Sequence, residues 1–246
     1  MKIHLLCAFY RKYLYKTLIN YYEKENIIFH PICDSVDIEP FKDNTLDWIQ
    51  PYQCPSLKIP GDQVYKKFDY FLDGNELIDD DFYGFIDDDS MYEPGFFSEL
   101  RKYSNFDIVY ISNYRGDKIP HDGSVGHAVA PLITRKKEDV RVDNIGLAMY
   151  FVKGRILKGT WYNSVSPVRF GNNWSGDDGL FAQKLLGTTN NIFFLSDWYV
   201  LGNYFQPGRH TDKNKFPKPN WILPEIIPTE YPNDWMMTYK SEYYKR

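Results

Sequence analysis

The stretch Tyr83-Gly84-Phe85-Ile86-Asp87-Asp88-Asp89-Ser90 decides the fold expected for this chain. Its first half is a short apolar run with the length and aromatic content of a strand, and three carboxylates follow it directly. Open α/β proteins bind ligands at the carboxyl edge of the sheet, so this strand is expected to bring carboxylates to a binding edge. Because side chains alternate along a strand, we expect Asp87 and Asp89 to point one way and Asp88 the other. Two hard oxygen ligands with nothing basic adjacent suit a divalent cation that carries substrate phosphates.

A solvated acidic turn is the simpler interpretation of such a run, and we expect the upstream triplet Asp79, Asp80 and Asp81 to be one. Two features set residues 87–89 apart. An apolar strand precedes them, and Glu93-Pro94 follows, which predicts a helix start with proline in its first turn.

Length and composition set the class of protein. The chain has 246 residues, 43% of them hydrophobic and 25% charged, as expected for one soluble α/β domain. A net charge of −4 gives no electrostatic footprint for nucleic acid. The three cysteines, Cys7, Cys33 and Cys54, have no metal-type spacing, so we expect reduced, buried thiols in a cytoplasmic protein. No run has the length of a transmembrane segment and no signal-peptide pattern is present, so any membrane work would be done peripherally.

The first half of the chain alternates between strand and helix patterns. A β-α-β unit opens it and places Arg11 and Asp34 at the same sheet edge. The alternation predicts a mostly parallel, doubly wound sheet. The expected strands are residues 2–9, 27–33, 83–86 and 106–112, and the expected helices lie near residues 14–22, 62–72 and 96–103.

The second half is less regular. Residues 113–143 are polar and rich in glycine and proline, which predicts a functional or mobile loop. Regular structure is expected again at 145–152, in a short helix near 155–157, in a helix at 177–186 and in a strand at 192–195. The end of the chain is rich in proline and tryptophan and is expected to wrap the surface or to serve as an interaction segment.

A second acidic pair, Asp177 and Asp178, begins the helix expected at 177–186. Ser175 or Asp177 would make a good N-cap, and the helix dipole favours a carboxylate in the first turn. Capping explains one aspartate more readily than two. We therefore expect the other carboxylate to face a cleft as a general base, with glycines on both sides that let a substrate approach closely.

These motifs, in this order, resemble the glycosyltransferases of the GT-A fold, closest to the family-2 inverting group. The similarity spans roughly residues 2–210. It implies a single Rossmann-like α/β domain over residues 1–212, with a mostly parallel central sheet flanked by helices. Residues 1–112 would form the nucleotide-binding half, 113–212 the acceptor and catalytic half, and 213–246 a tail packed on the domain or used for interaction.

The resemblance assigns the donor site to strand ends. Residues Cys7-Ala8-Phe9-Tyr10-Arg11 resemble a Tyr-x-Arg-like turn that helps to hold the nucleotide, which implicates Ala8, Phe9 and Arg11. Asp34 resembles the carboxylate that ends the second strand near the base. Gly146, in Asn144-Ile145-Gly146, resembles the glycine of a strand that faces the donor sugar.

The resemblance also assigns the metal and the base. Asp87, Asp88 and Asp89 resemble the DxD motif, in which the first aspartate lies near ribose or metal and the last binds the metal, with Asp88 counted among the donor contacts. Asp177-Asp178 resembles the x-Glu-Asp motif with aspartate in place of glutamate, which carries the base function to Asp178. His210 resembles a C-terminal histidine that reaches the metal or diphosphate. Lys66-Lys67 matches no motif of the family closely.

The implied reaction moves a hexose or deoxyhexose from a nucleoside diphosphate sugar, a UDP-sugar first or else a GDP- or dTDP-sugar, to a hydroxyl of a glycan, lipid-linked or protein-linked acceptor. Mn²⁺ or Mg²⁺ would be required, and a single displacement would invert the anomeric centre, with retention as the alternative. Trp161 and Trp174 are candidate acceptor contacts, because aromatic faces stack on sugar rings.

Two other classes share some of these features. Haloacid-dehalogenase-type phosphatases place a strand-end Asp-x-Asp and a later acidic motif around Mg²⁺, and Ser112 and Lys153 would complete that set. Against this class, Met91 stands where threonine or valine is expected, and a β-α-β unit precedes the acidic strand. A non-catalytic carbohydrate-binding module would use the many aromatic residues, but it leaves the second acidic pair without a purpose.

Overall fold

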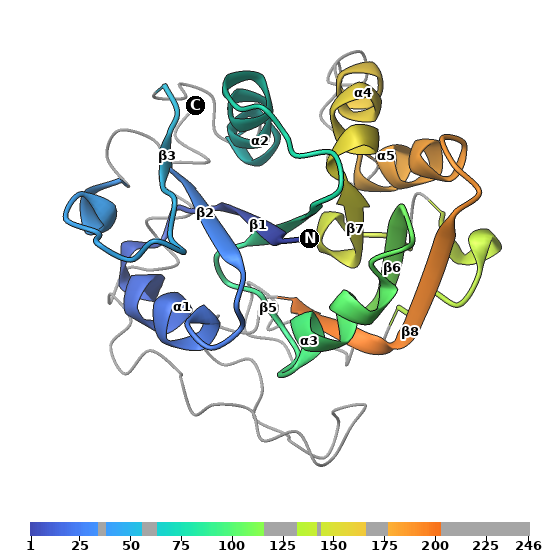
Figure 1. The fold of residues 1–246 in the computed structure, drawn as a ribbon, viewed down its shortest axis with the longest axis horizontal. Helices are drawn as coiled ribbons and strands as arrows, with labels where there is room; N and C mark the ends of the chain where they lie inside the picture. The colour runs from blue at the N-terminus through green and yellow to red at the C-terminus, as the bar shows by residue number, and fades with distance from the viewer. Residues whose placement is uncertain (34–37, 56–62, 116–131, 142–143, 166–176, 203–246) are drawn as a thin grey trace, which may run out of the picture.

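A computed structural model of the protein describes residues 1–33, 38–55, 63–115, 132–141, 144–165 and 177–202. The strand predicted at 83–86 is present as β4 (Phe82–Asp87), near the middle of the sheet (Figure 1). It pairs in parallel with β1 (Ile3–Ala8) and antiparallel with β7 (Tyr150–Lys153). All residues of β4 except Asp87 are buried, as expected for a strand whose two faces are both covered.

The described strands form one eight-stranded sheet in the order β3-β2-β1-β4-β7-β6-β8-β5. Four neighbouring pairs are parallel: β1–β2, β1–β4, β2–β3 and β6–β8. Three are antiparallel: β4–β7, β6–β7 and β5–β8. The predicted mixed α/β class with a mostly parallel sheet is confirmed. The remaining strands are β2 (Ile28–Cys33), β3 (Tyr52–Gln53), β5 (Met91–Tyr92), β6 (Ile108–Arg115) and β8 (Ile192–Gly202).

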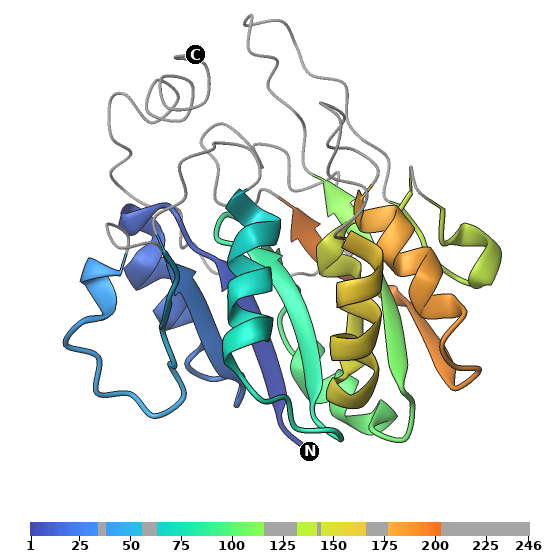
Figure 2. The same ribbon diagram turned by 90° about the horizontal axis from the view of Figure 1, so that it is seen from above.

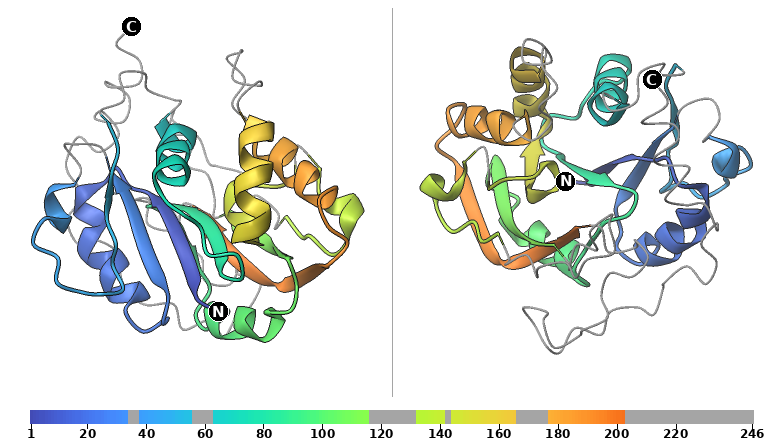
Figure 3. Two further views of the ribbon diagram at one scale, coloured as in Figure 1. Left: turned by 45° about the horizontal axis from the view of Figure 1, so that its top comes forward. Right: turned by 180° about the vertical axis from the view of Figure 1, so that it is seen from behind.

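Helices cover both sides of this sheet. The helices α2, α4 and α5 lie along one side, and α1 and α3 along the other (Figures 1 and 2). Figure 3 shows α4 and α5 side by side on the face of the sheet that they cover together with α2. The bounds are α1 (Tyr15–Tyr22), α2 (Gln63–Gly74), α3 (Phe96–Leu100), α4 (Gly154–Val165) and α5 (Asp177–Leu186), with short 3₁₀ turns η1 (Lys12–Leu14), η2 (Glu39–Phe41), η3 (Arg101–Tyr103), η4 (Lys137–Asp139) and η5 (Leu147–Met149).

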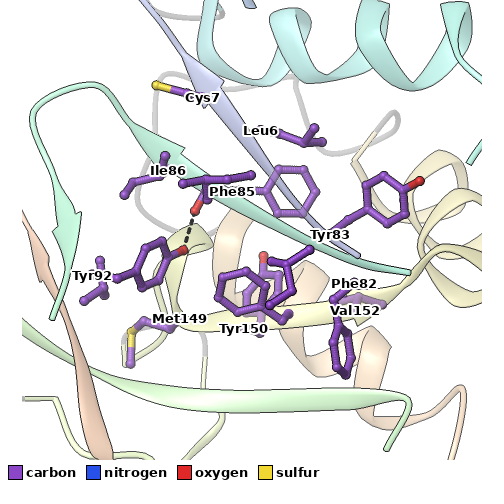
Figure 4. Packing of buried hydrophobic residues seen from close by; sticks show 14 of the residues in the cluster. Leu6, Cys7, Phe82, Tyr83, Phe85, Ile86, Tyr92, Met149, Tyr150 and Val152 are labelled. Atoms are coloured by element: carbon purple, nitrogen blue, oxygen red, sulfur yellow. Dashed lines mark hydrogen bonds between the residues drawn. The ribbon is translucent and has the colours of Figure 1, made fainter. Parts of the chain in front are cut away.

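The core is built around β4 and is dominated by aromatic rings (Figure 4). Phe85 stacks on Trp161 with ring centroids 5.1 Å apart, and the Tyr92 hydroxyl donates to the Phe85 carbonyl at 2.9 Å. Gly84 is required here, because a Cβ at this position would lie 2.2 Å from the Phe151 ring on β7. The three cysteines are buried free thiols, as predicted.

The sheet curls so that its far edge returns toward the end of β4. Only three residues separate Asp87 from β5, yet β5 pairs with β8 at the opposite end of the strand order. Glu93 fixes this closure from both sides: its main-chain N–H donates to the Tyr199 carbonyl, and its carboxylate accepts from the Tyr199 N–H, both at 3.1 Å. The end of β4 is thereby tied to strand β8, which comes about a hundred residues later.

Several predicted boundaries change. The helix expected after Glu93 begins at Phe96, because Gly95 adopts φ +80° as the N-cap and leaves Pro94 outside the helix. The regular stretch expected at 145–152 is η5 followed by β7, and the short helix expected near 155 is the twelve-residue α4. Residues 116–131 of the predicted loop and the 213–246 tail lie outside the described residues.

Candidate active site

The topology brings the sequence-predicted acidic motifs to one edge of the sheet. The strands β1, β4, β6 and β8 run in the same direction, so their carboxyl ends share an edge. Helix α5 precedes β8, which starts at the opposite edge beside the start of β6, so α5 begins at the carboxyl edge and runs back along the sheet (Figure 2). Asp177 and Asp178 therefore lie at the same edge as Asp87.

Asp87 is the last residue of β4 and its side chain is exposed. It lies beside Ala8 of β1 in the register of the sheet. The chain then turns, with the Ser90 N–H donating to the Asp87 carbonyl at 3.1 Å. Asp88 and Asp89 lie in this turn and not in the strand, so the alternation of side chains expected for residues 87–89 ends at Asp87.

Asp88 anchors the segment that follows β1. One carboxylate oxygen accepts the main-chain N–H groups of Tyr10 and Arg11, each at 2.7 Å, and the other oxygen pairs with the Arg11 guanidinium. Burial raises the pKa of the Asp88 carboxyl, while Arg11 and the two N–H groups act in the opposite direction. Asp88 is 0% exposed. The expected donor contact is thus wrong for Asp88, which holds the turn from beneath.

Arg11 also pairs with Asp89, its Nη2 lying 3.1 Å from Oδ2 of the carboxylate. The other oxygen of Asp89 accepts from the Ser90 hydroxyl at 3.3 Å. Two expectations are therefore wrong: a basic group lies beside the aspartates, and Asp88 and Asp89, which were expected to point to opposite faces, both pair with Arg11. The reason is the turn after Asp87, which directs two consecutive side chains toward the end of β1.

The sequence motifs do not predict that a lysine is buried at this edge. Lys67 of α2 is 0% exposed; its ammonium donates to the Phe9 carbonyl at 2.5 Å and lies 3.7 Å from the centre of the Tyr10 ring. One signal was available: Lys67 stands four residues before Phe71, and both fall on the face of α2 that packs on the sheet.

Other predicted donor residues are less direct. Ala8 and Phe9 are fully buried, so they support the turn from within the core instead of contacting a donor. Gly146 is not in a strand: it is buried, in extended backbone just before η5. Asp34 lies outside the described residues, as do Trp174 and His210, and the side chains of Asp177 and Asp178 are not among those described.

Trp161 is a core residue. Its ring is 1% exposed, stacks on Phe85 and meets Phe181 edge-on at 4.9 Å between centroids, and its indole N–H donates to Asp69 at 2.8 Å. No face of the ring is left for a sugar, so the expectation that Trp161 contacts an acceptor is wrong. An apolar position on a helix that packs against β4 explains this tryptophan fully.

The side-chain oxygens at this edge determine which metal ion could bind there. Within the described part of the chain, no group of three or more His, Cys, Asp or Glu side chains is arranged to hold a metal ion. Two oxygen donors do suit a hard cation: the exposed Asp87 carboxylate and the Asp89 oxygen that faces Ser90 instead of Arg11. Magnesium sites of this kind use one or two carboxylates and take their remaining ligands from phosphates and water.

The structure places Lys153, the lysine expected for a haloacid-dehalogenase-type phosphatase, far from Asp87. Lys153 ends β7 opposite Phe82, at the start of β4, and its ammonium donates to the Asp80 carbonyl. Asp87 stands five residues further along β4, which at about 3.3 Å per residue is roughly 17 Å away. Ser112 is likewise engaged, its hydroxyl donating to the Ser196 carbonyl at 2.6 Å.

No family model and no curated protein sequence matches the chain. Among solved structures, TarS residues 1–349 from S. aureus aligns with a TM-score of 0.54 at 15% identity, over 83% of this chain and 62% of the TarS chain. HddC from Yersinia pseudotuberculosis aligns at a TM-score of 0.42 and 12% identity in its complex with GMP-PN, over 83% of this chain and 94% of that one. No helix among the described residues is both long enough and apolar enough to cross a bilayer. The TarS likeness shows the fold alone, and that fold is the Rossmann-like GT-A fold.

Proposed function

We propose that this chain is a metal-dependent glycosyltransferase that moves a sugar from a nucleoside diphosphate sugar to a hydroxyl acceptor. One observation carries the proposal: at the carboxyl edge of a GT-A-type sheet, the exposed Asp87 stands beside the Arg11–Asp88–Asp89 cluster and the acidic start of α5. The Rossmann-like GT-A fold, which the likeness to TarS shows, supports the choice of class.

Arg11 is the residue best suited to meet the donor diphosphate. Its side chain is 15% exposed, and its position is fixed by two carboxylates and by the main-chain bonds of its own turn. A guanidinium stays charged at all relevant pH values and matches the geometry of phosphate oxygens. Asp34, which follows β2 in the sequence, would contact the nucleoside of a UDP-, GDP- or dTDP-sugar.

A divalent cation, Mn²⁺ or Mg²⁺, would be held by Asp87 and Asp89, with His210 as a further ligand. When bound, it neutralises the charge that develops on the departing diphosphate. Arg11, which pairs with Asp89, limits the negative charge of this edge in the absence of the cation.

Asp178 would act as the general base. At the start of α5 it lies at the donor edge, where a carboxylate can take the proton of an acceptor hydroxyl as that oxygen attacks the anomeric carbon. Attack opposite the diphosphate inverts the sugar. Asp177 would cap the helix.

Trp174 stays a candidate contact for a glycan, lipid-linked or protein-linked acceptor. We place the reaction in the cytoplasm, at or near a membrane surface.

A thermal-shift screen tests the proposal. UDP-, GDP- and dTDP-sugars are added with and without Mn²⁺, and a donor at 100 times its dissociation constant should stabilise the fold by about 2.7 kcal/mol. We expect one nucleotide class to raise the melting temperature, and only with the metal. No shift with any donor would contradict the proposal, as would hydrolysis of an aryl phosphate that is lost in Asp87→Asn.

A further inference from the structure

Lys67 is buried at the edge where the donor site is proposed, although an uncompensated buried ammonium is costly. It has a compensating environment: a strong hydrogen bond to the Phe9 carbonyl and the face of the Tyr10 ring. A leucine or methionine would fill the same space without the cost of burying a charge. The charge therefore requires an explanation beyond packing.

The segment that Lys67 contacts is held from three directions. On the β2 side, the Phe9 N–H donates to the Ile32 carbonyl at 3.1 Å. On the β4 side, Asp88 accepts the N–H groups of Tyr10 and Arg11. Lys67 supplies the third direction from α2, through the Phe9 carbonyl. Hydrogen bonds to main-chain groups thus fix residues 9–11 to β2, to the turn after β4 and to α2. These bonds lie directly before the side chain of Arg11.

We propose that Lys67 is a positioning residue of the donor site: it fixes residues 9–11 so that Arg11 meets the diphosphate. This inference rests on the proposed function. Lys67 also adds positive charge close to the acidic turn, since its ammonium bonds to the Phe9 carbonyl and Asp88 accepts the N–H of the next residue, Tyr10. The two effects work in the same direction, because a correctly placed Arg11 and a less negative edge both favour an anionic ligand.

The chain contains a matched control. Lys153 is 3% exposed; its ammonium donates to the main-chain carbonyl of Asp80 and lies 4.6 Å from the centre of the Phe82 ring. Both lysines are therefore buried, bonded to a carbonyl and placed over an aromatic ring. They differ in location, because Lys153 lies at the amino edge of the sheet and Lys67 at the carboxyl edge.

The experiment compares Lys67→Met with Lys153→Met. Titration calorimetry with UDP, GDP and dTDP, each with Mn²⁺, gives the dissociation constants, and urea unfolding gives the stability. Both variants should change the stability by a similar amount, because each replaces a buried ammonium that is bonded to a carbonyl. Lys67→Met should weaken binding of the preferred nucleoside diphosphate by about tenfold, the scale of one charge-assisted contact, while Lys153→Met changes it less than twofold. In turnover, Lys67→Met should raise KM for the donor more than it lowers kcat.

Two results would overturn the inference: unchanged affinity in Lys67→Met, or an equal loss of affinity in both variants, which would mark general destabilisation. If Lys67→Met does not fold, Lys67→Gln takes its place, because glutamine keeps an N–H donor without the charge, and the same comparison with Lys153→Met decides. If the unmodified chain binds none of the three nucleotides, the proposed function fails and this inference fails with it.

Discussion

Two triplets of aspartates flank β4, and the fold uses them differently. The amino-end triplet is Asp79, Asp80 and Asp81, and the carboxyl-end triplet is Asp87, Asp88 and Asp89. In the amino-end triplet Asp81 is buried, accepts from the Lys2 N–H at 2.6 Å and contacts His4. In the carboxyl-end triplet Asp88 and Asp89 are both buried, and Asp88 accepts from the turn after β1. In each, an arginine pairs with the triplet, Arg155 with Asp80 and Arg11 with Asp88.

The difference lies in what each triplet holds. The amino-end triplet bonds to residues at the ends of regular elements, namely the start of β1, the end of β7 and the first turn of α4. The carboxyl-end triplet holds a loop segment and presents Asp87 and Arg11 at an edge to which α5 also brings acidic residues. Residue type therefore does not separate the structural triplet from the triplet proposed to form the donor site, whereas its position at the amino or carboxyl end of the strand does.

The largest effect should come from the buried members. Asp88→Asn breaks a buried charge pair with Arg11, which costs about 3–5 kcal/mol. Asp81→Asn removes a buried carboxylate that accepts from the Lys2 N–H, which costs about 1–3 kcal/mol. We expect both variants to lose stability in urea unfolding. Only Asp88→Asn should also weaken nucleotide binding, because it releases Arg11. Weaker nucleotide binding in both variants, or in Asp81→Asn alone, would contradict the placement of the donor site at the carboxyl end of β4.

The acidic start of α5 gives the next effect. Asp178→Asn keeps the shape of the side chain but cannot accept the acceptor's proton, so turnover should fall roughly a hundredfold with donor binding unchanged. Asp177→Asn should instead lower stability by about 1 kcal/mol or less, as expected for a helix cap. Steady-state kinetics with melting curves separates them. If Asp177→Asn is inactive and Asp178→Asn active, the two roles are exchanged.

The exposed members of the two triplets should also differ in their effect on nucleotide binding. Asp87 and Asp79 are both exposed carboxylates at opposite ends of β4. Loss of groups that only support metal ligands typically lowers metal affinity about 10–100-fold, so Asp87→Asn should weaken Mn²⁺-dependent nucleotide binding at least tenfold. Asp79→Asn should leave it unchanged. Calorimetric titration of both variants checks this, and equal affinities would remove Asp87 from the site.

A pH dependence of stability belongs to the amino end and leaves the donor edge unchanged. Nδ1 of His4 and Nε2 of His30 lie 2.9 Å apart, and burial, followed by the effect of His4, lowers the pKa of His30 to about 3. His30 is thus neutral in the folded chain, whereas the unfolded chain binds a proton below its ordinary pKa of about 6.5. Stability is retained above pH 6.5 and lost as the pH falls toward 3, by up to about 1.4 kcal/mol per pH unit for His30.

Urea unfolding between pH 7 and pH 5 measures this slope. Burial also lowers the pKa of His4, although Asp81 opposes the shift, so His4 adds to the slope in the same direction. We expect His30→Gln to be less acid-sensitive than the unmodified chain. The same slope in both would show that the histidine pair is not responsible.

How far the sequence predicts this molecule depends on the range of the interactions. The strands β1, β2 and β4 were predictable because they are apolar runs buried on both faces. The two-residue β5 was not, because its pairing with Leu201 and Val200 depends on residues more than a hundred positions away. The same holds for the site: the strand end at Asp87 follows from local pattern, whereas the bond from Asp88 to the turn after β1 spans 78 residues.

Backbone NMR shifts on adding Mg²⁺ with UDP, GDP or dTDP test the central claim, that the carboxyl end of β4 and not its amino end is the donor site. We predict that the amide signals of Tyr10, Arg11 and Ser90 shift, while those of His4, Asp81 and Gly154 stay in place. The first group lies at the carboxyl end of β4 and the second at its amino end. Shifts confined to the second group, or spread equally over both, would contradict the account.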